Sequence, residues 1–268
     1  MTMITFKSAT ELEAMRQSSR IMAVVLGELE PLIRPGIRTR DLDLYAEKRT
    51  RELGAVPAFK GYRGYPASVC ISVNEEIIHG IPSGRILQDG DIVSLDFGVL
   101  YEGFYSDSAL TAPVGRASEE ASKLIAAAER SFYKGLAQMK EGNRLSDISA
   151  AIQQSVESEG FSVIRQFVGH GIGRALHEDP QVPKFGPPGR GPKIRPGMTL
   201  AIEPMIAAGG HEVEILEDGW TAVTLDRSLA AHYEHTVAMT ENGPEVLSAR
   251  TPDTARPGIR LPKESPHA

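Results

Sequence analysis

Apolar residues recur at helical spacing near the start of the chain. The repeating positions are Leu12, Met15, Met22, Leu26 and Leu29, which would share one face of a helix. Ser8 and Glu11 have the spacing of a capping box, so this helix should begin there and end before Pro31. A second helix is predicted over 39–53, followed by a Gly- and Tyr-rich loop over 59–66.

Runs of apolar and β-branched residues predict three strands after this loop. They are expected over Val69–Val73, Ile92–Phe97 and Phe104–Leu110, with a turn at 101–103 between the last two.

The second half of the chain repeats the order of two helices followed by strands. Ser118 opens a long helix that Gly142 ends, and a further helix is predicted over 146–160. Their inward faces should be formed by Ile125, Ala128, Phe132, Leu136 and Met139, and by Ile148, Ile152 and Val156. Strands are then expected over Phe161–Val168, Met198–Ile206, Val213–Leu216, Thr221–Leu225 and His232–Met239.

Short sequence matches between the halves favour an internal duplication. Gly36, Arg38, Asp41 and Leu42 recur as Gly142, Arg144, Asp147 and Ile148 at an offset of 106, and Gly90 and Asp96 recur as Gly197 and Glu203 at an offset of 107. Each match is short enough to arise by chance, but both lie within the same order of elements. The predicted fold class is therefore α/β, of the α+β type, with two pseudo-symmetric helix–helix–strand halves.

Length and composition limit the remaining possibilities. We expect one large domain at 1–250, a stiff Pro- and Gly-rich loop at 180–197 and a disordered Pro-rich tail at 251–268. The net charge of −6 gives no strong nucleic-acid signal, and no apolar run is long enough for a membrane span. With one cysteine and no signal peptide, a cytoplasmic protein is expected, and any metal would need His, Asp or Glu ligands.

An aspartate is unusual among apolar strand residues, and Asp96 lies in such a run. In a hairpin with an even-length loop, paired residues have numbers that sum to 203 or to 205. The first register places Asp96 opposite Asp107, and the second makes them diagonal on one face. Because two like charges repel at that distance, a cation between them is the simplest solution.

Two further acids, Glu203 and Glu234, repeat this pattern in the second half. One buried acid is more simply explained by a salt bridge, whereas four carboxylates would balance two divalent cations and suit a hydrolytic centre. His79 and His170 border glycines, which permit close approach to a metal or substrate but are equally typical of turns. Cys70 is more simply a buried small hydrophobic residue than a nucleophile.

Several longer stretches resemble the methionine aminopeptidases, specifically their short bacterial type I form. The stretches are 61–82, 89–111, 167–183, 197–205 and 230–240, within a match from about residue 4 to residue 247. Each stretch alone is modestly specific, but together they are highly specific. The resemblance implies the pita-bread fold, with pseudo-twofold symmetry and a central antiparallel sheet.

The resemblance also implies a metal centre. Its five ligands would be Asp96, Asp107, His170, Glu203 and Glu234, with Asp107 and Glu234 bridging two divalent ions (Co, Mn, Fe or Zn). A water or hydroxide between the ions would be the nucleophile, and Glu203 would shuttle its proton. His79 and His177 would contact the scissile peptide and steady the tetrahedral intermediate.

The implied activity is removal of the N-terminal methionine from nascent proteins and peptides whose second residue is small. We expect a monomer that acts on nascent chains at the ribosome. The methionine would enter a pocket formed by Phe59, Tyr62, Tyr65, Cys70, Leu176 and Trp220. Two positions depart from the family, since Leu176 replaces an aromatic residue and Phe59 a smaller one, and we hypothesise a compensating swap. Ser94 replaces an Asn beside the first metal strand.

Three alternatives remain. An Xaa-Pro peptidase of the same fold would carry a large extra N-terminal domain, whereas the first helix here begins near Ser8. A eukaryotic-type (type II) enzyme would carry a helical insertion, for which the spacing from His177 to Glu203 leaves no room. A non-catalytic binding module would lose metal ligands, and all five implied ligands are present.

Overall fold

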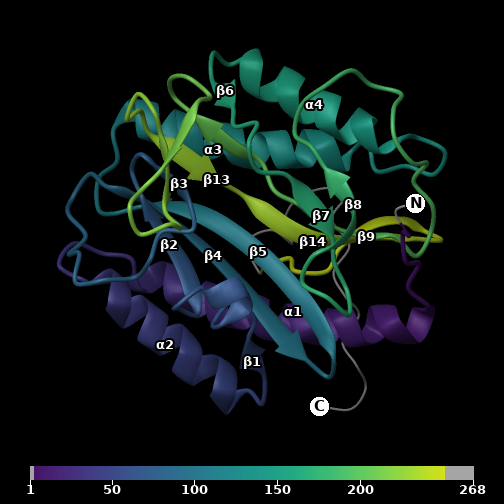
Figure 1. Cartoon of the computed structure of the whole chain (residues 1–268), viewed down its shortest axis with the longest axis horizontal. Helices are drawn as coiled ribbons and strands as arrows, with labels where there is room; N and C mark the ends of the chain where they lie inside the picture. Colours follow the sequence, from purple (N-terminus) through teal and green to yellow (C-terminus); the bar gives the residue numbers. More distant parts are fainter. Residues whose placement is uncertain (1–2, 251–268) are drawn as a thin grey trace.

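Two pairs of helices flank a central antiparallel sheet in the computed structural model, which describes residues 3–250 (Figure 1). The helices are α1 (Ala9–Leu29), η1 (Glu30–Leu32), α2 (Thr39–Glu52), η2 (Tyr62–Gly64), α3 (Glu119–Leu136) and α4 (Leu145–Glu157). α1 packs on α2 below the sheet in this view, and α3 packs on α4 above it. The predicted order of two helices followed by strands in each half is therefore confirmed, while the predicted tail at 251–268 lies outside the described residues.

The ends of the helices follow their capping residues. Ser8 Oγ accepts a hydrogen bond from the Glu11 N–H (3.3 Å), and Glu11 Oε2 accepts one from the Ser8 N–H (3.0 Å), so the predicted capping box is formed. α3 ends at Leu136, earlier than predicted, because the N–H of Met139 bonds three residues back to Leu136 and tightens the chain into a turn. The predicted inward residue Ile125 is only half-buried, because the helix turns Leu124 into the core instead.

The central sheet is organised around one long hairpin, β4 (Ile92–Tyr101) and β5 (Phe104–Pro113). Its order is β1-β4-β5-β14-β9-β7-β8, and β2 also pairs with β4 and β15 with β14. The bounds are β1 Val56–Pro57, β2 Val69–Val73, β7 Gly169–Gly171, β8 Glu178–Val182, β9 Thr199–Ile202, β14 Glu234–Thr240 and β15 Gly243–Val246. The two-residue turn of the hairpin has positive φ at Glu102 (49°) and Gly103 (79°), as a type I′ turn requires.

Three of the long strands predicted for the second half are interrupted. The segment 161–168 contains only β6 (Ser162–Val163), while 198–206 is divided into β9 and β10 (Met205–Ala207), and 232–239 lies in β13 (Ala230–His232) and β14. Pro204 lacks an N–H to continue the ladder, and its carbonyl accepts a hydrogen bond from the Tyr233 N–H (3.0 Å). These two breaks let the chain leave the central sheet for a three-stranded sheet, β13-β10-β6.

A third sheet joins β11 (Val213–Ile215), β12 (Ala222–Thr224) and β3 (Glu76–Ile78). Strands were predicted at β11 and β12 but not at β3. β1, β3, β7, β8 and β15 were not predicted, since each is short and carries Pro, Gly or charged residues that weaken the strand pattern.

The internal duplication is visible in the backbone. Arg38 forms an isolated antiparallel bridge with Ile86, and Arg144, 106 positions later, forms one with Lys193. The flanking hydrogen bonds also correspond, since Gly36 N–H bonds to the Leu87 carbonyl and Gly142 N–H to the Ile194 carbonyl. Gly36 and Gly142 share a positive φ of 90° and 88°. The two halves therefore enter their second helix by the same loop geometry.

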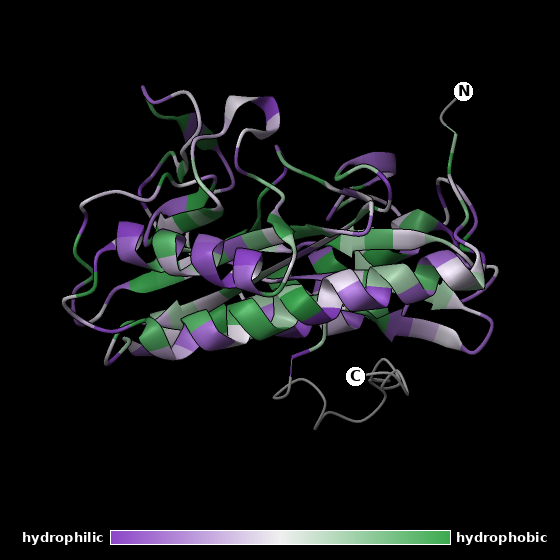
Figure 2. Ribbon diagram, turned by 90° about the horizontal axis from the view of Figure 1, so that it is seen from below, coloured by the Kyte–Doolittle hydropathy of each residue, from purple (hydrophilic) through white to green (hydrophobic). Residues whose placement is uncertain are grey.

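Each half has its own apolar core. One core lies between α1, α2 and the faces of β2, β4 and β5, and the other lies between α3, α4 and β9, β10 and β14. Figure 2 shows the loops gathered on one side of the layer that helices and strands form. No described helix has the length and apolar character needed to cross a membrane.

Two glycines inside helices should respond oppositely to a methyl group. A Cβ at Gly135 of α3 would lie 2.7 Å from Ile152 Cγ1 of α4, whereas a Cβ at Gly27 of α1 would meet nothing within 4 Å. We expect Gly135→Ala to destabilise the protein by about 1–3 kcal/mol through overpacking. Gly27→Ala should stabilise it by about 0.5–1 kcal/mol, because alanine loses less backbone entropy in a helix. Urea unfolding midpoints measure both, and shifts in the same direction would contradict this packing.

Candidate active site

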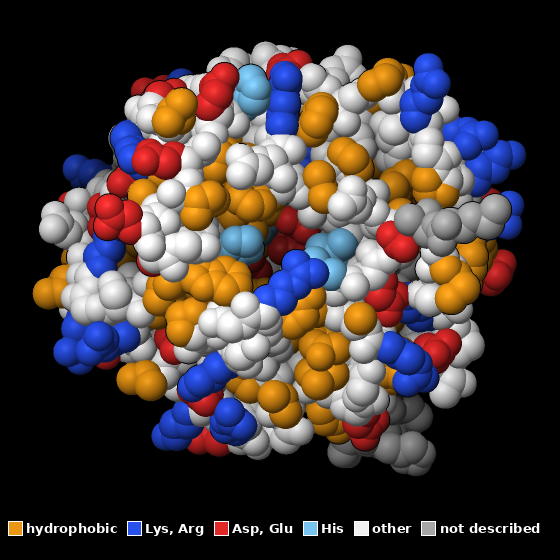
Figure 3. Space-filling view, in the orientation of Figure 1, with side chains coloured by type: hydrophobic (Ala, Val, Ile, Leu, Met, Phe, Trp, Pro, Cys, Tyr) orange, Lys and Arg blue, Asp and Glu red, His pale blue; other side chains and the backbone are white. Residues whose placement is uncertain are grey.

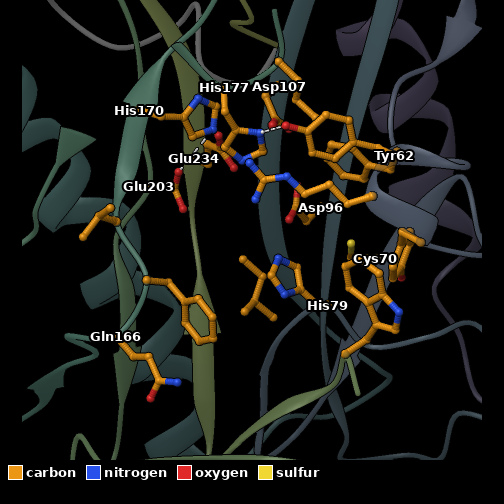
Figure 4. A pocket seen from close by; sticks show the side chains of 18 residues that line it. Tyr62, Cys70, His79, Asp96, Asp107, Gln166, His170, His177, Glu203 and Glu234 are labelled. Atoms are coloured by element: carbon orange, nitrogen blue, oxygen red, sulfur yellow. Dashed lines mark hydrogen bonds and ion pairs between the residues drawn. The ribbon is translucent and has the colours of Figure 1, made fainter. Parts of the chain in front are cut away.

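The residues predicted to form the metal centre and the methionine pocket line one cavity of about 380 Å³. Figure 3 shows the hollow on one face of the molecule, with acidic side chains at its bottom and histidines beside it. The acids, His170 and Cys70 come from the central sheet or its ends, and most of the other lining residues come from loops (Figure 4). The cavity is lined by Phe59, Tyr62, Arg63, Tyr65, Cys70, Ile78, His79, Asp96, Asp107, Gln166, Phe167, Val168, His170, Leu176, His177, Glu203, Trp220 and Glu234.

The hairpin register brings the first two carboxylates together diagonally. Asp96 pairs with Ala109 and Asp107 pairs with Gly98, so the paired numbers sum to 205, and the alternative register with Asp96 opposite Asp107 is wrong. Ala109 pairs on its other side with Glu234 of β14. Directly paired residues point to the same side of a sheet, so Asp96 and Glu234 flank the small Ala109 in one row.

His170 and Glu203 form the opposite side of the cluster. His170 Nδ1 lies 2.8 Å from the Gly171 carbonyl, and a proton on Nδ1 to donate there leaves Nε2 with its lone pair. Nε2 lies 3.6 Å from Oε1 of Glu203, a residue at the break between β9 and β10. An imidazole held in this tautomer is prepared to bind a metal through Nε2.

The cluster fits a divalent cation because several of its oxygens lack partners. Asp96 Oδ1, Asp107 Oδ1 and Glu234 Oε1 are buried and have no hydrogen-bond partner within residues 3–250. One ligand atom from each of Asp107, His170 and Glu234 lies within 4.8 Å of the others. Buried polar atoms without partners are costly, and carboxylate plus imidazole donors suit divalent metals.

Burial raises the pKa of every carboxyl in the cluster. The pKa of Asp96 rises to about 7 and that of Glu203 to about 8, while those of Asp107 and Glu234 rise well above their ordinary values. For Asp107 and Glu234 the charges of neighbouring carboxylates add to the effect. Without a cation, the protein therefore favours protonated carboxyl groups at this place.

A buried lysine, which was not predicted, lies near the same acids. Lys184 is 1% exposed, and its Nζ donates a hydrogen bond to the Phe167 carbonyl (2.6 Å). Burial lowers its pKa to about 8, and the charges of Glu203 and Glu234 counteract this effect. Its ammonium group in turn lowers the pKa of Glu203, so Lys184 supplies one positive charge to the cluster.

His79 is presented to the cavity by an unusual backbone conformation. Its φ is 62°, and a Cβ on the following Gly80 would lie 2.3 Å from the Ile71 carbonyl oxygen of β2. The turn therefore needs glycine at position 80 to approach the strand this closely. The His79 ring contacts Phe167 and Trp220 edge to face, and burial lowers its pKa to about 4.

His177 reaches the cavity from the loop before β8. Its Nδ1 lies 2.9 Å from the Tyr62 hydroxyl, and the two rings stack with centroids 5.3 Å apart (Figure 4). Burial, together with the charge of His170, lowers its pKa to about 3. His79 and His177 are therefore neutral near pH 7, with one ring nitrogen available to donate a hydrogen bond.

The predicted methionine pocket is an apolar wall beside the acids. Tyr65 and Trp220 meet edge to face at 5.2 Å, and the Tyr65 hydroxyl is tied to the Gly80 carbonyl at 2.8 Å. Cys70 of β2 pairs with Asp96 of β4, and burial raises the pKa of its thiol well above normal. A thiol held protonated in this way acts as an apolar wall rather than a nucleophile.

Five lining residues were not predicted as site residues, namely Arg63, Ile78, Gln166, Phe167 and Val168. Their nearness in sequence to Tyr62, His79 and His170 was the available signal, because loops beside functional residues commonly share their cavity.

Comparison with known proteins assigns the family. The model of metallopeptidase family M24 matches residues 13–241. The methionine aminopeptidase 1 of Bacillus subtilis is 52% identical over 246 residues, which cover 92% of this chain and 99% of that protein. The chain belongs to the methionine aminopeptidases of metallopeptidase family M24. A methionine aminopeptidase of Clostridium perfringens is 55% identical, again over 92% of this chain and 99% of the relative.

Solved structures agree with the pita-bread fold. The methionine aminopeptidase of Thermotoga maritima superposes with a TM-score of 0.91 at 46% identity, covering 92% of this chain and all of that one. The prolidase of Pyrococcus furiosus shares the fold, with a TM-score of 0.75 at 22% identity, but only 65% of its chain is covered. The bacterial methionine aminopeptidases match over their full length and the prolidase does not.

In the metal-free protein, the free energy of unfolding should fall as the pH rises from about 6.5 to about 8. In the metal-free protein the carboxyl pKa values are raised above those of the unfolded chain, so the folded state binds more protons across this window. Below this pH window the buried histidines, whose pKa values are lowered, make stability rise with pH. Above the window the lowered pKa of Lys184 has the same effect. Thermal unfolding with EDTA measures the trend.

The matched experiment repeats these melts with a divalent ion. Metal binding requires ionised carboxylates, so the stabilisation by metal should grow over the same pH range. A metal-free Tm that is constant or rises from pH 6.5 to 8 would contradict the strongly raised carboxyl pKa values.

Proposed function

We propose that this protein removes the N-terminal methionine from polypeptides whose second residue is small, using two divalent ions. The observation that carries the proposal is the convergence of four buried carboxylates and His170 beside an aromatic wall in one cavity. Asp96, Asp107, His170, Glu203 and Glu234 are the residues that would hold the ions. When bound, such ions lower the pKa of water and polarise the peptide carbonyl.

Glu203 is proposed to move the proton during hydrolysis. It lies at the break between β9 and β10, where its carboxyl is buried and faces His170. Burial raises its pKa to about 8 in the metal-free protein, which supports a carboxyl that can take up or release a proton near neutral pH. This is the property required of a general base that later acts as an acid.

His79 and His177 are proposed to hold the scissile peptide. If the Tyr62 hydroxyl donates to His177 Nδ1, then His177 Nε2 carries the proton and can donate toward the cavity. His79 is fixed by Phe167 and Trp220. Neutral donors held rigidly in a buried site can stabilise charge that develops on a carbonyl oxygen.

The substrate's methionine is proposed to contact Phe59, Tyr62, Tyr65, Cys70, Leu176 and Trp220. A flexible thioether packs favourably on aromatic rings, and the uncharged methionine side chain needs no charged residue in the pocket. Leu176 and Phe59 are both buried in the same apolar cluster, in keeping with a compensating exchange of sizes.

The wider context is likewise proposed. Co, Mn, Fe or Zn would each suit these ligands, and availability would decide among them. The substrates would be nascent chains at the ribosome in the cytoplasm, and the protein would act as a monomer in one domain at 1–250.

A peptide assay separates this function from prolidase activity. Met-Ala-Ser should be cleaved and Ala-Pro peptides should not, EDTA should abolish cleavage, and Co²⁺, Mn²⁺ or Fe²⁺ should restore it. Glu203→Gln should lower kcat by about 10²–10⁴-fold through loss of proton transfer, with weaker metal binding adding to the effect. The exposed Glu241→Gln is the matched control and should retain full activity. No cleavage with any of these metals would refute the proposal, and cleavage of Ala-Pro would favour the prolidase alternative.

Leu176→Phe tests the pocket wall. The larger ring should fill space in the cavity, raise KM for methionine peptides and lower kcat/KM on the order of tenfold. Leu44→Phe, on the exposed face of α2, is the control and should leave both constants unchanged. Unchanged KM and selectivity in Leu176→Phe would count against a role for this residue in the pocket.

A further inference from the structure

One buried histidine next to the carboxylates has no role in the chemistry described so far. His232 ends β13, lies two residues before Glu234 and is 1% exposed. Its Nε2 is 3.5 Å from Glu234 Oε2. His232 is not among the residues that line the cavity, so it approaches the carboxylates from within the protein.

The ring of His232 lacks hydrogen-bond partners. Neither Nδ1 nor Nε2 has one within the described range 3–250. A neutral imidazole carries one N–H and one lone pair, and leaving both unused in a buried place is unfavourable. Asp96 Oδ1 and Glu234 Oε1 are unpartnered in the same way. Three neighbouring side chains therefore each offer an unused ligand atom.

Ligand atoms of these three residues are close enough to share one cation. One atom from each of Asp96, His232 and Glu234 lies within 4.8 Å of the other two. Two ligands of a tetrahedral zinc ion, each about 2.1 Å from the metal, are separated by about 3.4 Å. The 3.5 Å between His232 Nε2 and Glu234 Oε2 is close to that separation.

The backbone of His232 is held rigidly. Thr111 Oγ1 accepts a hydrogen bond from the His232 N–H (2.8 Å) and donates one to the His232 carbonyl (2.9 Å). Ser94 Oγ lies 2.8 Å from the same hydroxyl, which leaves Ser94 as the donor. Ser94 therefore supports the backbone of His232 through Thr111.

We propose that His232 is a further metal ligand and forms, with Asp96 and Glu234, the site of one of the two ions. The inference rests on the proposed two-metal function and adds a ligand to it. His170, Asp107 and Glu234 form the second group, so each ion would be bound by one imidazole. The imidazole supplies a lone pair without adding negative charge to a cluster that already holds four carboxylates.

Nuclear magnetic resonance of the ring nitrogens tests the proposal directly. The full chain is labelled with ¹⁵N-histidine and titrated with Zn²⁺, a diamagnetic probe, to two equivalents. A ring nitrogen that binds zinc changes its shift and ceases to titrate with pH. We expect two of the seven histidines to respond in this way, His170 and His232. His232→Gln should remove one of these signals and weaken one zinc affinity by about tenfold to a hundredfold or more.

The control is His211→Gln, which makes the same substitution at a histidine outside the cavity. It should leave both zinc-bound signals and both affinities unchanged. If His232→Gln fails to fold, the number of zinc-bound histidines in the wild-type protein decides the matter without it.

The other outcomes overturn the proposal. A zinc-bound nitrogen at His170 alone would show that His232 is not a ligand, and a loss of affinity in His232→Gln would then mean that it only positions Glu234. That result would leave the proposed peptidase function intact. No zinc-bound histidine in the wild-type protein would refute both the further ligand and the two-metal function, and the peptide assay would fail as well.

Discussion

The mutual repulsion of four buried carboxylates is the constraint on which the rest of this structure depends. Asp96, Asp107, Glu203 and Glu234 lie at the bottom of one cavity, and burial raises their pKa values. A fold that only had to be stable would not bring them together, since apolar residues would pack there at less cost. The arrangement becomes favourable when cations bind, so the stability of the site and its chemistry depend on the same ions.

The duplicated scaffold explains how the acids meet. Each half contributes strands to the middle of the central sheet, and β5 pairs with β14 where the halves join. Asp96 and Asp107 come from a continuous hairpin, whereas Glu203 and Glu234 lie where strands of the second half break. The hydrogen bond from the Tyr233 N–H to the Pro204 carbonyl links the two breaks. The halves are therefore alike in their helices and differ where the site needs irregular backbone.

Local patterns predicted the parts of this protein that local interactions determine. The capping box of Ser8, the repeat of apolar residues in the helices and the shared face of Asp96 and Asp107 follow from neighbours in sequence. The sequence alone left two hairpin registers open. The structure has the register whose turn residues are Glu102 and Gly103, both with positive φ. The buried polar residues Lys184 and His232 gave no local signal, because their burial depends on segments distant in sequence. The roles of the implied ligands came from family resemblance and from geometry.

Charge balance also accounts for the kind of side chains around the acids. A fifth carboxylate would add to the repulsion, whereas Lys184 offsets part of it and neutral imidazoles leave the charge unchanged. His232 and Glu234 are two residues apart, so an extended backbone would direct both side chains to one side, although Tyr233 interrupts the strand between them. The small Ala109 between Asp96 and Glu234 keeps that side open. Under this constraint histidine is a suitable source of further donor atoms, because a neutral imidazole binds a metal without adding negative charge.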